Sequence, residues 1–363
     1  MIRILSMRYL RQKSFIHARR ILSVAVFLVA VILGAEGFCD TQPPREKALS
    51  VNYPPDKTVM ELGLLSISLT VPQGSTDLII VNVNGNEKAR IIPDNKIECF
   101  TIPISAGYNE IDVTAIKSSK LVGKNIIDVY RRSDLERAYK DPPAGFQKDY
   151  FHMKEHSQCT GCHILTPGKS DRKPVNIAAF PIEDMRIEEK ILAKTSTCYS
   201  CHKNIASYPF VHGPVAVWSC LSCHDPVTEP KYSVKKPDTK SCYSCHVGQK
   251  EERLTKKYRH GPVNTGMCTI CHNPHASEDP FFLVKSTWDL CINCHIDKGS
   301  GKHIVKIFPG KNFHPTRGTL DPLRKNRELT CASCHDPHAS KTPQLFRANL
   351  GTGFMLCKKC HAD

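Results

Sequence analysis

Long hydrophobic runs are almost missing from this 363-residue chain. The one clear run, residues 21–35, has 15 residues, whereas a helix needs about 20 to span a bilayer. Aromatic residues make up only 7% of the chain, and no stacking platform of the kind that binds single-stranded nucleic acid is evident. Histidine is absent from residues 51–130. The scarcity of aromatic residues argues against nucleic-acid binding. The absence of histidine from residues 51–130 divides the chain into regions of different character.

The N-terminal segment has the composition of an export signal. Six basic residues and no acidic residue lie within residues 1–20, ahead of the apolar run. Ala35 and Gly37 supply the small residues required before a cleavage site at Phe38. We expect residues 1–37 to be a signal peptide, or else an uncleaved membrane anchor. The protein should then be exported to the periplasm, or to the outer-membrane or extracellular side, of a Gram-negative-type bacterium.

Residues 50–131 show the pattern of short β-strands. Leu65, Ile67, Leu69 and Val71 alternate with polar residues, which is typical of strands with one buried face. Further strands are expected at 78–83, 88–92, 97–104, 110–116 and 121–130. This spacing predicts a small, antiparallel, all-β sandwich, with a polar connector at 132–147.

Two local features refine this prediction. Asn84-Gly85 between two expected strands is a strong hairpin signal. The stretch 107–115, GYNEIDVTA, is similar to a late strand of bacterial Ig-like modules, and the resemblance implies an Ig-like sandwich. A barrel or a carbohydrate-binding-like sandwich stays open as an alternative.

Every Cys-x-x-Cys pair in the chain is followed directly by histidine, and the eight copies use 16 of the 18 cysteines. This is the attachment signature of c-type haem. Two thiols on one helical turn can add to the haem vinyl groups, and the adjacent imidazole becomes the proximal ligand of the iron. We therefore predict eight covalently bound haem c groups. The attachment residues are Cys159, Cys162, His163; Cys198, Cys201, His202; Cys220, Cys223, His224; Cys242, Cys245, His246; Cys268, Cys271, His272; Cys291, Cys294, His295; Cys331, Cys334, His335; and Cys357, Cys360, His361.

Cys-x-x-Cys pairs also occur in zinc sites and disulfide scaffolds. Neither of these needs histidine directly after the second cysteine, so both are weaker interpretations. Cys39 and Cys99 fall outside the pattern. They could pair in an oxidising compartment, or Cys99 could be a small buried strand residue and Cys39 part of a frayed terminus.

The region that carries the motifs, residues 148–363, is rich in proline, lysine and turn residues. It has only about 27 residues for each motif, which is too little chain to wrap each porphyrin separately. We therefore expect haems packed against one another as the core of a loop-rich, mostly irregular domain with short helices. Haems in contact would permit fast electron tunnelling.

A longer repeat groups the motifs. His212-Gly-Pro-Val and His260-Gly-Pro-Val each begin eight residues before a motif. His-Asp-Pro or His-Asn-Pro closes the third, fifth and seventh motifs, and His275 and His338 follow the last two of these. The motifs thus form four pairs, and residues 150–363 resemble the doubled-CxxCH family of multihaem cytochromes c. The resemblance implies electron transfer through stacked haem pairs. The first pair departs from it in lacking the His-Gly-Pro segment, and the second in having Val227 in place of the trailing histidine.

Eight histidines remain once the eight motif histidines and His17, in the export segment, are set aside. There is thus one spare histidine for each haem, and we predict mostly bis-His, six-coordinate irons. The methionines of the mature chain show no repeating offset from the motifs. Since Met/His ligation raises the potential of a haem, low potentials are expected. The candidate distal ligands are His152, His156, His212, His260, His275, His303, His314 and His338.

The formal charge of +15 falls to +10 without residues 1–37. Eight ferric haems with ionised propionates would bring it to about +2, so the basic side chains are best interpreted as partners of the propionates. We expect an exported octahaem cytochrome that carries single electrons from an inner-membrane quinol-linked donor to a periplasmic or outer-membrane acceptor. A porin association or self-assembly through the Ig-like module is also possible. The alternatives are an octahaem enzyme with one open haem, of the nitrite, hydroxylamine or tetrathionate type, and a subunit of an extracellular filament.

Overall fold

The computed structural model describes residues 48–169, 171, 196–299, 314–347 and 353–361. The predicted signal segment 1–37, Cys39 and His303 lie outside the described residues, so neither export nor a Cys39–Cys99 pair is addressed by the fold. Residues 47–363 form one compact unit. Within the described residues, none of the helices is both long and apolar enough to cross a bilayer.

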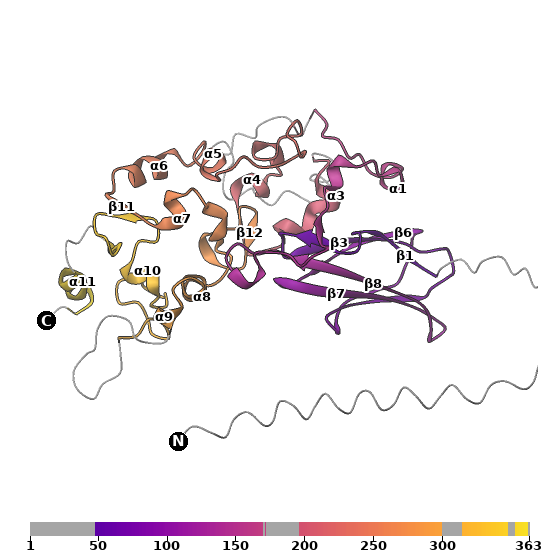
Figure 1. Cartoon of the computed structure of the whole chain (residues 1–363), viewed down its shortest axis with the longest axis horizontal. Coiled ribbons are helices and arrows are strands. Elements are labelled where there is room, and N and C mark those ends of the chain that lie inside the picture. The colour runs from indigo at the N-terminus through magenta and orange to yellow at the C-terminus, as the bar shows by residue number, and fades with distance from the viewer. Residues whose placement is uncertain (1–47, 170, 172–195, 300–313, 348–352, 362–363) are drawn as a thin grey trace, which may run out of the picture. The chain divides into compact units, whose positions relative to one another are not determined.

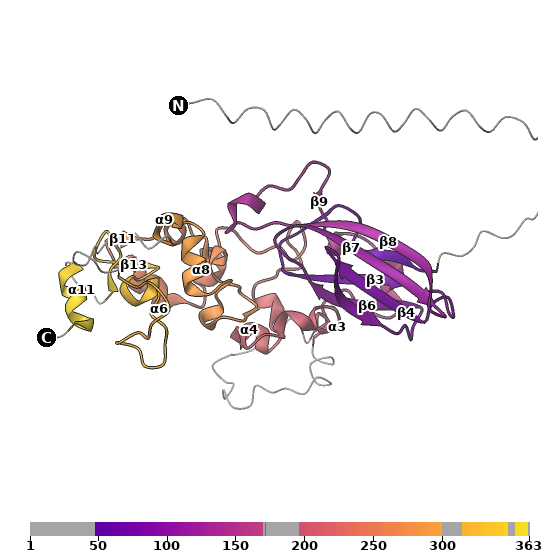
Figure 2. The same cartoon turned by 90° about the horizontal axis from the view of Figure 1, so that it is seen from below.

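The N-terminal part of this unit consists of two β-sheets (Figures 1 and 2). The three-stranded sheet has the order β1 (Ser50–Tyr53), β3 (Leu64–Thr70), β6 (Ile97–Pro103). The six-stranded sheet has the order β5 (Asn86–Ile91), β4 (Leu78–Val83), β7 (Gly107–Lys117), β8 (Lys120–Arg131), β2 (Thr58–Met60), β9 (Gln147–Lys148). The predicted β-region is therefore present.

The core lies between the two sheets. Strands β3, β4 and β7 bury every second residue, because successive side chains of a strand point to opposite faces. Leu65, Ile67 and Leu69 from one sheet meet Val81 and Val113 from the other, and all five are at most 1% exposed. Full burial of such a side chain contributes about 1.5–3 kcal/mol.

The turn between β4 and β5 follows the sequence prediction. Asn84 and Gly85 both have positive φ, at 51° and 77°. This conformation matches the twist of a tight hairpin, and Asn and Gly adopt it at low cost. The two strands then pair in antiparallel register from Ile79–Ile91 to Val83–Asn86.

The expected purely antiparallel arrangement was wrong at one edge. Strand β2 pairs in parallel with both β8 and β9. The chain leaves the three-stranded sheet after β1, and at Lys57, which has a positive φ of 59°, it joins the other sheet. There the Lys57 N–H donates to Asp128 O at 2.8 Å. Three residues of β2 carry too weak a pattern to reveal this long-range pairing.

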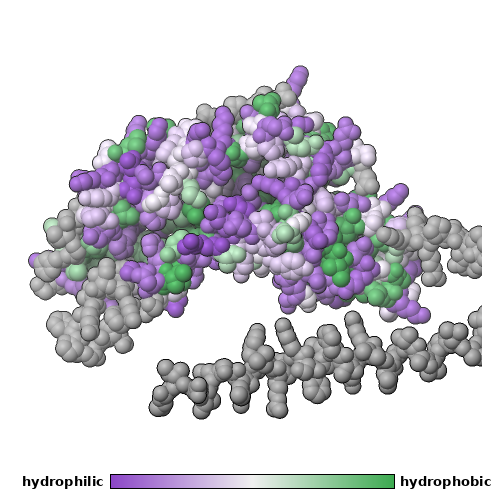
Figure 3. Space-filling model, in the orientation of Figure 1, coloured by the Kyte–Doolittle hydropathy of each residue, from purple (hydrophilic) through white to green (hydrophobic). Residues whose placement is uncertain are grey.

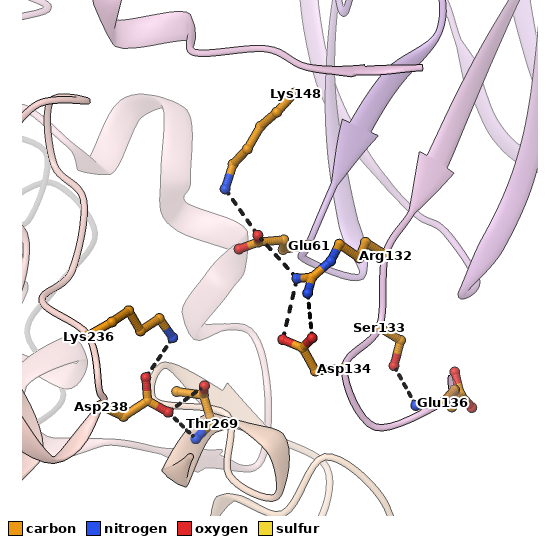
Figure 4. A network of polar contacts seen from close by, with 9 residues as sticks. All are labelled: Glu61, Arg132, Ser133, Asp134, Glu136, Lys148, Lys236, Asp238 and Thr269. Carbon is orange, nitrogen blue, oxygen red and sulfur yellow. Dashed lines mark hydrogen bonds and ion pairs between the residues drawn. The ribbon is translucent and has the colours of Figure 1, made fainter. Parts of the chain in front are cut away.

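The predicted connector 132–147 is tied back to the β-region. Arg132 forms ion pairs with Glu61, at 3.7 Å, and with Asp134, and Lys148 pairs with Glu61 at 3.0 Å (Figure 4). Leu135 is buried. The connector is thus packed rather than free, although exposed ion pairs of this kind contribute little energy.

Residues 148–363, here called the motif region, are loop-rich with short helices, as predicted (Figure 1). None of its described helices exceeds eight residues. The α-helices are α1 (Ser157–Thr160), α3 (Tyr199–His202), α4 (Gly213–Ala216), α5 (Thr239–Cys242), α6 (Val247–Leu254), α7 (Gly261–Asn264), α8 (Thr287–Ile292), α9 (Ile296–Gly299), α10 (Cys331–Cys334) and α11 (Gly353–Cys360). The 3-10 turns are η1 (Arg137–Tyr139), just before the region, and η2 (Phe151–Met153), η6 (Lys203–Ala206), η7 (Cys220–Ser222), η8 (Cys268–Ile270) and η9 (Pro280–Phe282).

Two short ladders join distant parts of the motif region. Strand β10 (Phe210–Val211) pairs with β12 (Ala276–Ser277), and β11 (Tyr258–Arg259) pairs with β13 (Ala339–Ser340). Both are antiparallel and two residues long. Each places the segment before one motif pair beside the segment that follows the first motif of the next pair.

Candidate functional site

Each of the eight motifs forms a single helical turn. The backbone N–H of the motif histidine donates to the carbonyl oxygen of the first cysteine at 2.8–3.0 Å in every copy, for example from His163 to Cys159 and from His224 to Cys220. This bond holds both thiols and the imidazole on one turn. None of the 17 described cysteines forms a disulfide. The residues are therefore placed for two thioether links and one axial ligand.

Within the described residues, six motif histidines face a second imidazole. The pairs are His202 with His152, His224 with His275, His246 with His212, His272 with His338, His295 with His260, and His361 with His314. Their ring centres lie 6.0–6.2 Å apart. By contrast, the direct ring stack of His156 on Phe151 measures 3.7 Å. Each pair thus leaves a gap between its rings.

The size of this gap fits a metal ion. A histidine nitrogen binds a first-row metal such as zinc at about 2.0–2.1 Å, so two axial imidazoles on one metal have ring centres about 6 Å apart. The six pairs have this spacing. Within the described part of the chain, no group of three or more His, Cys, Asp or Glu side chains is arranged to hold a metal ion by itself. The pairs therefore fit the two axial positions of a haem iron, with the porphyrin supplying the remaining ligands.

Backbone carbonyls orient the imidazoles. The Nδ1 atoms of His224, His272 and His335 lie 2.7–2.8 Å from the carbonyl oxygens of Tyr232, Phe281 and Gln344. A protonated Nδ1 that donates to a carbonyl leaves the lone pair on Nε2, which is then free to bind a metal. The sequence could not reveal these partners, since every residue has a carbonyl group.

Distal candidates are oriented in the same way. Nδ1 of His212 lies 2.9 Å from Pro274 O. The backbone N–H of His212 donates to His275 O, and that of His260 donates to His338 O, both at 2.9 Å. Each histidine that precedes a motif pair is thus held by the trailing Pro-His of the next pair, beside the two short ladders. The repeats interlock.

Burial keeps several of these imidazoles neutral. It lowers the pKa of His152 to about 4, with a smaller contribution from His202, and it lowers the pKa of His275 to about 4, with a smaller contribution from His224. Below-normal values mean that the rings lose their proton well under pH 7. The neutral imidazole is the form that binds metals.

Thiols of successive motifs lie next to one another. The first cysteine of the second motif in one pair interacts with the first cysteine of the next pair: Cys198 with Cys220, Cys242 with Cys268, and Cys291 with Cys331. The intervening motifs interact electrostatically through Cys159 and Cys201, Cys223 and Cys242, Cys271 and Cys294, and Cys334 and Cys360. Every motif therefore lies beside the next one along the chain.

A large cavity runs beside the first five motifs. Its volume is about 2220 Å³, well above the about 300–1,000 Å³ of an ordinary ligand pocket. Motif residues line it from Cys159 to His272, and the three-stranded sheet closes it with Ser68, Cys99 and Phe100. The cavity offers room for several porphyrins, and the β-region forms one of its walls.

The structure does not bring every predicted residue to a partner. His156 lies against Phe151, and its Nε2 is 2.8 Å from Phe151 O. His303 lies outside the described residues, so its relation to His335 is not addressed. His163 faces no second imidazole within the described residues. The ligand roles themselves remain predictions.

A buried carboxylate connects two consecutive motifs (Figure 4). Asp238 precedes α5 and accepts hydrogen bonds from the backbone N–H and hydroxyl of Thr269, both at 2.8 Å, while Lys236 pairs with it at 2.6 Å. Burial raises the pKa of Asp238, but the bonds from Lys236 and Thr269 outweigh this and hold it below its usual value. Sequence reasoning missed this residue, because an aspartate just before a motif resembles any helix-start residue.

Replacing Asp238 by alanine should destabilise the haem-loaded protein by about 2–3 kcal/mol, because bonds to a buried charged group are lost. Denaturant unfolding followed by absorbance in the Soret band would measure this. Glu87→Ala is the control, since Glu87 forms an exposed pair with Arg90, and it should leave the midpoint unchanged. Equal effects of the two substitutions would contradict a linking role for Asp238.

Three stretches of the chain match the family model described as the doubled CXXCH motif: residues 212–251, 260–300 and 322–363. These are the last three of the four predicted motif pairs. The doubled motif indicates covalently bound c-type haem. The chain is accordingly similar to multihaem cytochromes, which points to electron transfer. No curated protein sequence matches the chain.

Solved structures resemble only part of the chain. An FMN-binding β-glucuronidase from Facaelibacterium prausnitzii L2-6 is 12% identical over 28% of this chain and 13% of its own, with a TM-score of 0.20. The fibronectin(III)-like modules of Clostridium thermocellum CbhA are 15% identical over 23% of this chain and 94% of their own, with a TM-score of 0.20. A Bacteroides uniformis β-glucuronidase is 13% identical over 23% of this chain and 10% of its own, with a TM-score of 0.19. The chain thus spans a small fraction of the two glucuronidases, and at these TM-scores the likeness carries no argument.

Proposed function

We propose that the protein is an exported octahaem c-type cytochrome that passes single electrons along a row of mostly bis-His haems. The observation that carries this proposal is the set of six imidazole pairs with ring centres 6.0–6.2 Å apart. Each pair joins one motif histidine to one histidine outside the motifs. An iron held by two imidazoles has no free position for substrate, which suits a carrier of electrons.

The haems would lie in the order of their motifs. Electrostatic interactions link the thiols of each motif to those of the next, from Cys159 with Cys201 at one end to Cys334 with Cys360 at the other. Since both thiols of a motif attach to its porphyrin, neighbouring thiols bring neighbouring porphyrins together. Such a row supplies short tunnelling distances along the whole motif region.

The two ends of the row differ in their surroundings. The three-stranded sheet closes the cavity beside the first motif, whereas Cys357, Cys360 and His361 of the last motif are exposed. We propose that a redox partner docks near α11, where Lys358 and Lys359 add positive charge. The face in Figure 3 is mainly hydrophilic, with hydrophobic residues in small separate patches. A polar, reversible contact therefore suits this protein better than a permanent apolar one.

Export, and a respiratory donor and acceptor on either side of the row, remain part of the proposal. The basic and apolar segments within residues 1–37 support export, and covalent haem attachment takes place beyond the bacterial inner membrane. The proposed partners are an inner-membrane quinol-linked donor and a periplasmic or outer-membrane acceptor.

The experiment that tests the proposal combines a haem count with loss of one distal ligand. Pyridine haemochrome analysis should give eight haems per chain, and a count near six would contradict it. The His212→Ala variant should add one high-spin haem to the electron paramagnetic resonance spectrum, because His246 loses its partner. This assignment is specific to the fourth motif. In a chain that also carries Cys242→Ala and Cys245→Ala, the His212→Ala change should add no further high-spin signal, and an added signal would refute the pairing.

A further inference from the structure

The imidazole pairs follow a rule that the repeats share. The histidine before a motif pair faces the second motif of that pair: His212 faces His246, and His260 faces His295. The histidine that trails the first motif of a pair instead faces the first motif of the preceding pair. His275 faces His224 in this way, and His338 faces His272.

The first pair obeys the first half of this rule. His152 precedes the motif at Cys159 and faces His202, the histidine of the second motif. By the second half of the rule, the residue that trails the third motif should face His163 of the first motif. That residue is Val227. An isopropyl group has no lone pair and cannot bind a metal.

The backbone around Val227 has the same turn as its two counterparts. The Val227 N–H donates to Asp225 Oδ1 at 3.0 Å. The His275 N–H donates to Asn273 Oδ1 at 3.0 Å, and the His338 N–H donates to an Asp336 oxygen at 2.9 Å. The turn after the third motif therefore differs from the other two in its trailing side chain, which is valine in place of histidine. Val227 is 85% exposed.

The other histidines near the first motif are engaged elsewhere. His152 faces His202 at 6.1 Å. His156 stacks on Phe151 at 3.7 Å with an interplanar angle of 10°, and its Nε2 is 2.8 Å from Phe151 O. A ring held in this way does not present its nitrogen to His163. Met153 also has a partner, since its sulfur accepts from the Lys231 N–H at 3.3 Å.

The imidazole of the first motif lies at the wall of the cavity, beside the three-stranded sheet. His163 lines the cavity of about 2220 Å³, together with Leu165 and Pro167. Ile164, next in the chain, is 71% exposed. The surface of the three-stranded sheet, with Cys99 and Thr101, lines the same cavity. The first motif therefore lies close to the protein surface.

We propose that the haem of the first motif, Cys159–His163, is five-coordinate from the protein and takes a small inorganic ligand with one lone-pair donor, such as a diatomic molecule or a compact anion. Val227 at the trailing position is what leaves its iron open. This inference rests on the proposed function, since it requires haem at the first motif. It adds a ligand-binding site at the end of the row beside the three-stranded sheet.

The test uses the full-length, haem-loaded protein and cyanide as the probe. Electron paramagnetic resonance of the oxidised protein should show a high-spin ferric signal for the first haem, and cyanide should convert that haem to low spin. The Cys159→Ala, Cys162→Ala variant should lose this signal together with one haem. His156→Ala should leave the signal and the cyanide response unchanged.

Val227→His is the decisive variant, and Val227→Ala is its matched control. The histidine should close the iron, so that this high-spin signal and the cyanide response disappear, whereas the alanine variant should keep both. A signal that survives Val227→His would overturn the assignment of position 227. Eight haems that are all low spin in the unaltered protein would overturn the inference alone. If the unaltered protein holds seven haems and the Cys159→Ala, Cys162→Ala variant also holds seven, both the eight-haem proposal and this inference are overturned.

Discussion

A chain with Cys242→Ala and Cys245→Ala, attached to an electrode through its C-terminus, is expected to exchange four electrons at fast scan rates where the unaltered chain exchanges eight. The variant lacks the haem of the fourth motif. The haems of the fifth to eighth motifs stay connected to the electrode, while those of the first three lie beyond the gap. Tunnelling falls steeply with separation, so the gap stops fast exchange. Protein-film voltammetry measures the number of electrons, and pyridine haemochrome analysis confirms that seven haems remain.

The matched control removes a haem at the far end of the row. Cys159→Ala with Cys162→Ala also leaves seven haems, but it should allow seven electrons to exchange rapidly, because no gap lies between them and the electrode. The fourth motif is placed between the third and the fifth by the interactions of Cys242 with Cys223 and with Cys268. Seven fast electrons in both variants would show that a second route passes around the fourth motif.

The second large effect concerns folding without haem. Chain produced where no haem is attached should fold at residues 48–135 and remain unfolded over the motif region. Of the 25 buried apolar residues described, 18 lie at or before Leu135 and only seven lie in the motif region. Seven such side chains, at about 1.5–3 kcal/mol each, cannot offset the conformational entropy of more than 200 residues at about 1–2 kcal/mol each.

Hydrogen–deuterium exchange would measure this difference. Amides of β3, β4 and β7 should be protected with and without haem, whereas those of the motif region should exchange at once in the haem-free chain. The haem-loaded protein is the control, and both regions should be protected in it. Protection of the ladder β11–β13 without haem would show that the motif region has a core of its own and would contradict the prediction.

The sequence predicted the features that depend on neighbouring residues. The alternation of Leu65, Ile67 and Leu69 reports directly which side of a strand is buried. Asn84-Gly85 specifies its turn through the φ angles that these two residues tolerate. The motif spacing likewise fixes a local geometry, since the bond from the motif histidine to the first cysteine closes within one turn. These interactions span at most a few residues, so the pattern contains them.

Other features could not be read from the sequence, because they depend on segments far apart in the chain. Strand β2 lies parallel to β8 through contacts between Val59 and Tyr130, and three residues carry no signal for that choice. The number of spare histidines equals the number of motifs, but the two numbers alone do not show which histidine faces which motif. The count also treated His156 as equivalent to the others, whereas the structure holds its ring against Phe151.

The sequence by itself determined that this chain presents eight haem-attachment motifs in a loop-rich region behind a small β-region. Tertiary packing alone brings His275 to His224, across the boundary between two motif pairs, and His152 to His202, within the first pair. The spacing of each motif acts within one helical turn, whereas the second imidazole is brought to its partner by the interlocking of repeats that lie far apart in the sequence. The same interlocking carries the proposal for Val227, which stands where the next two repeats have a histidine that faces a motif of the preceding pair.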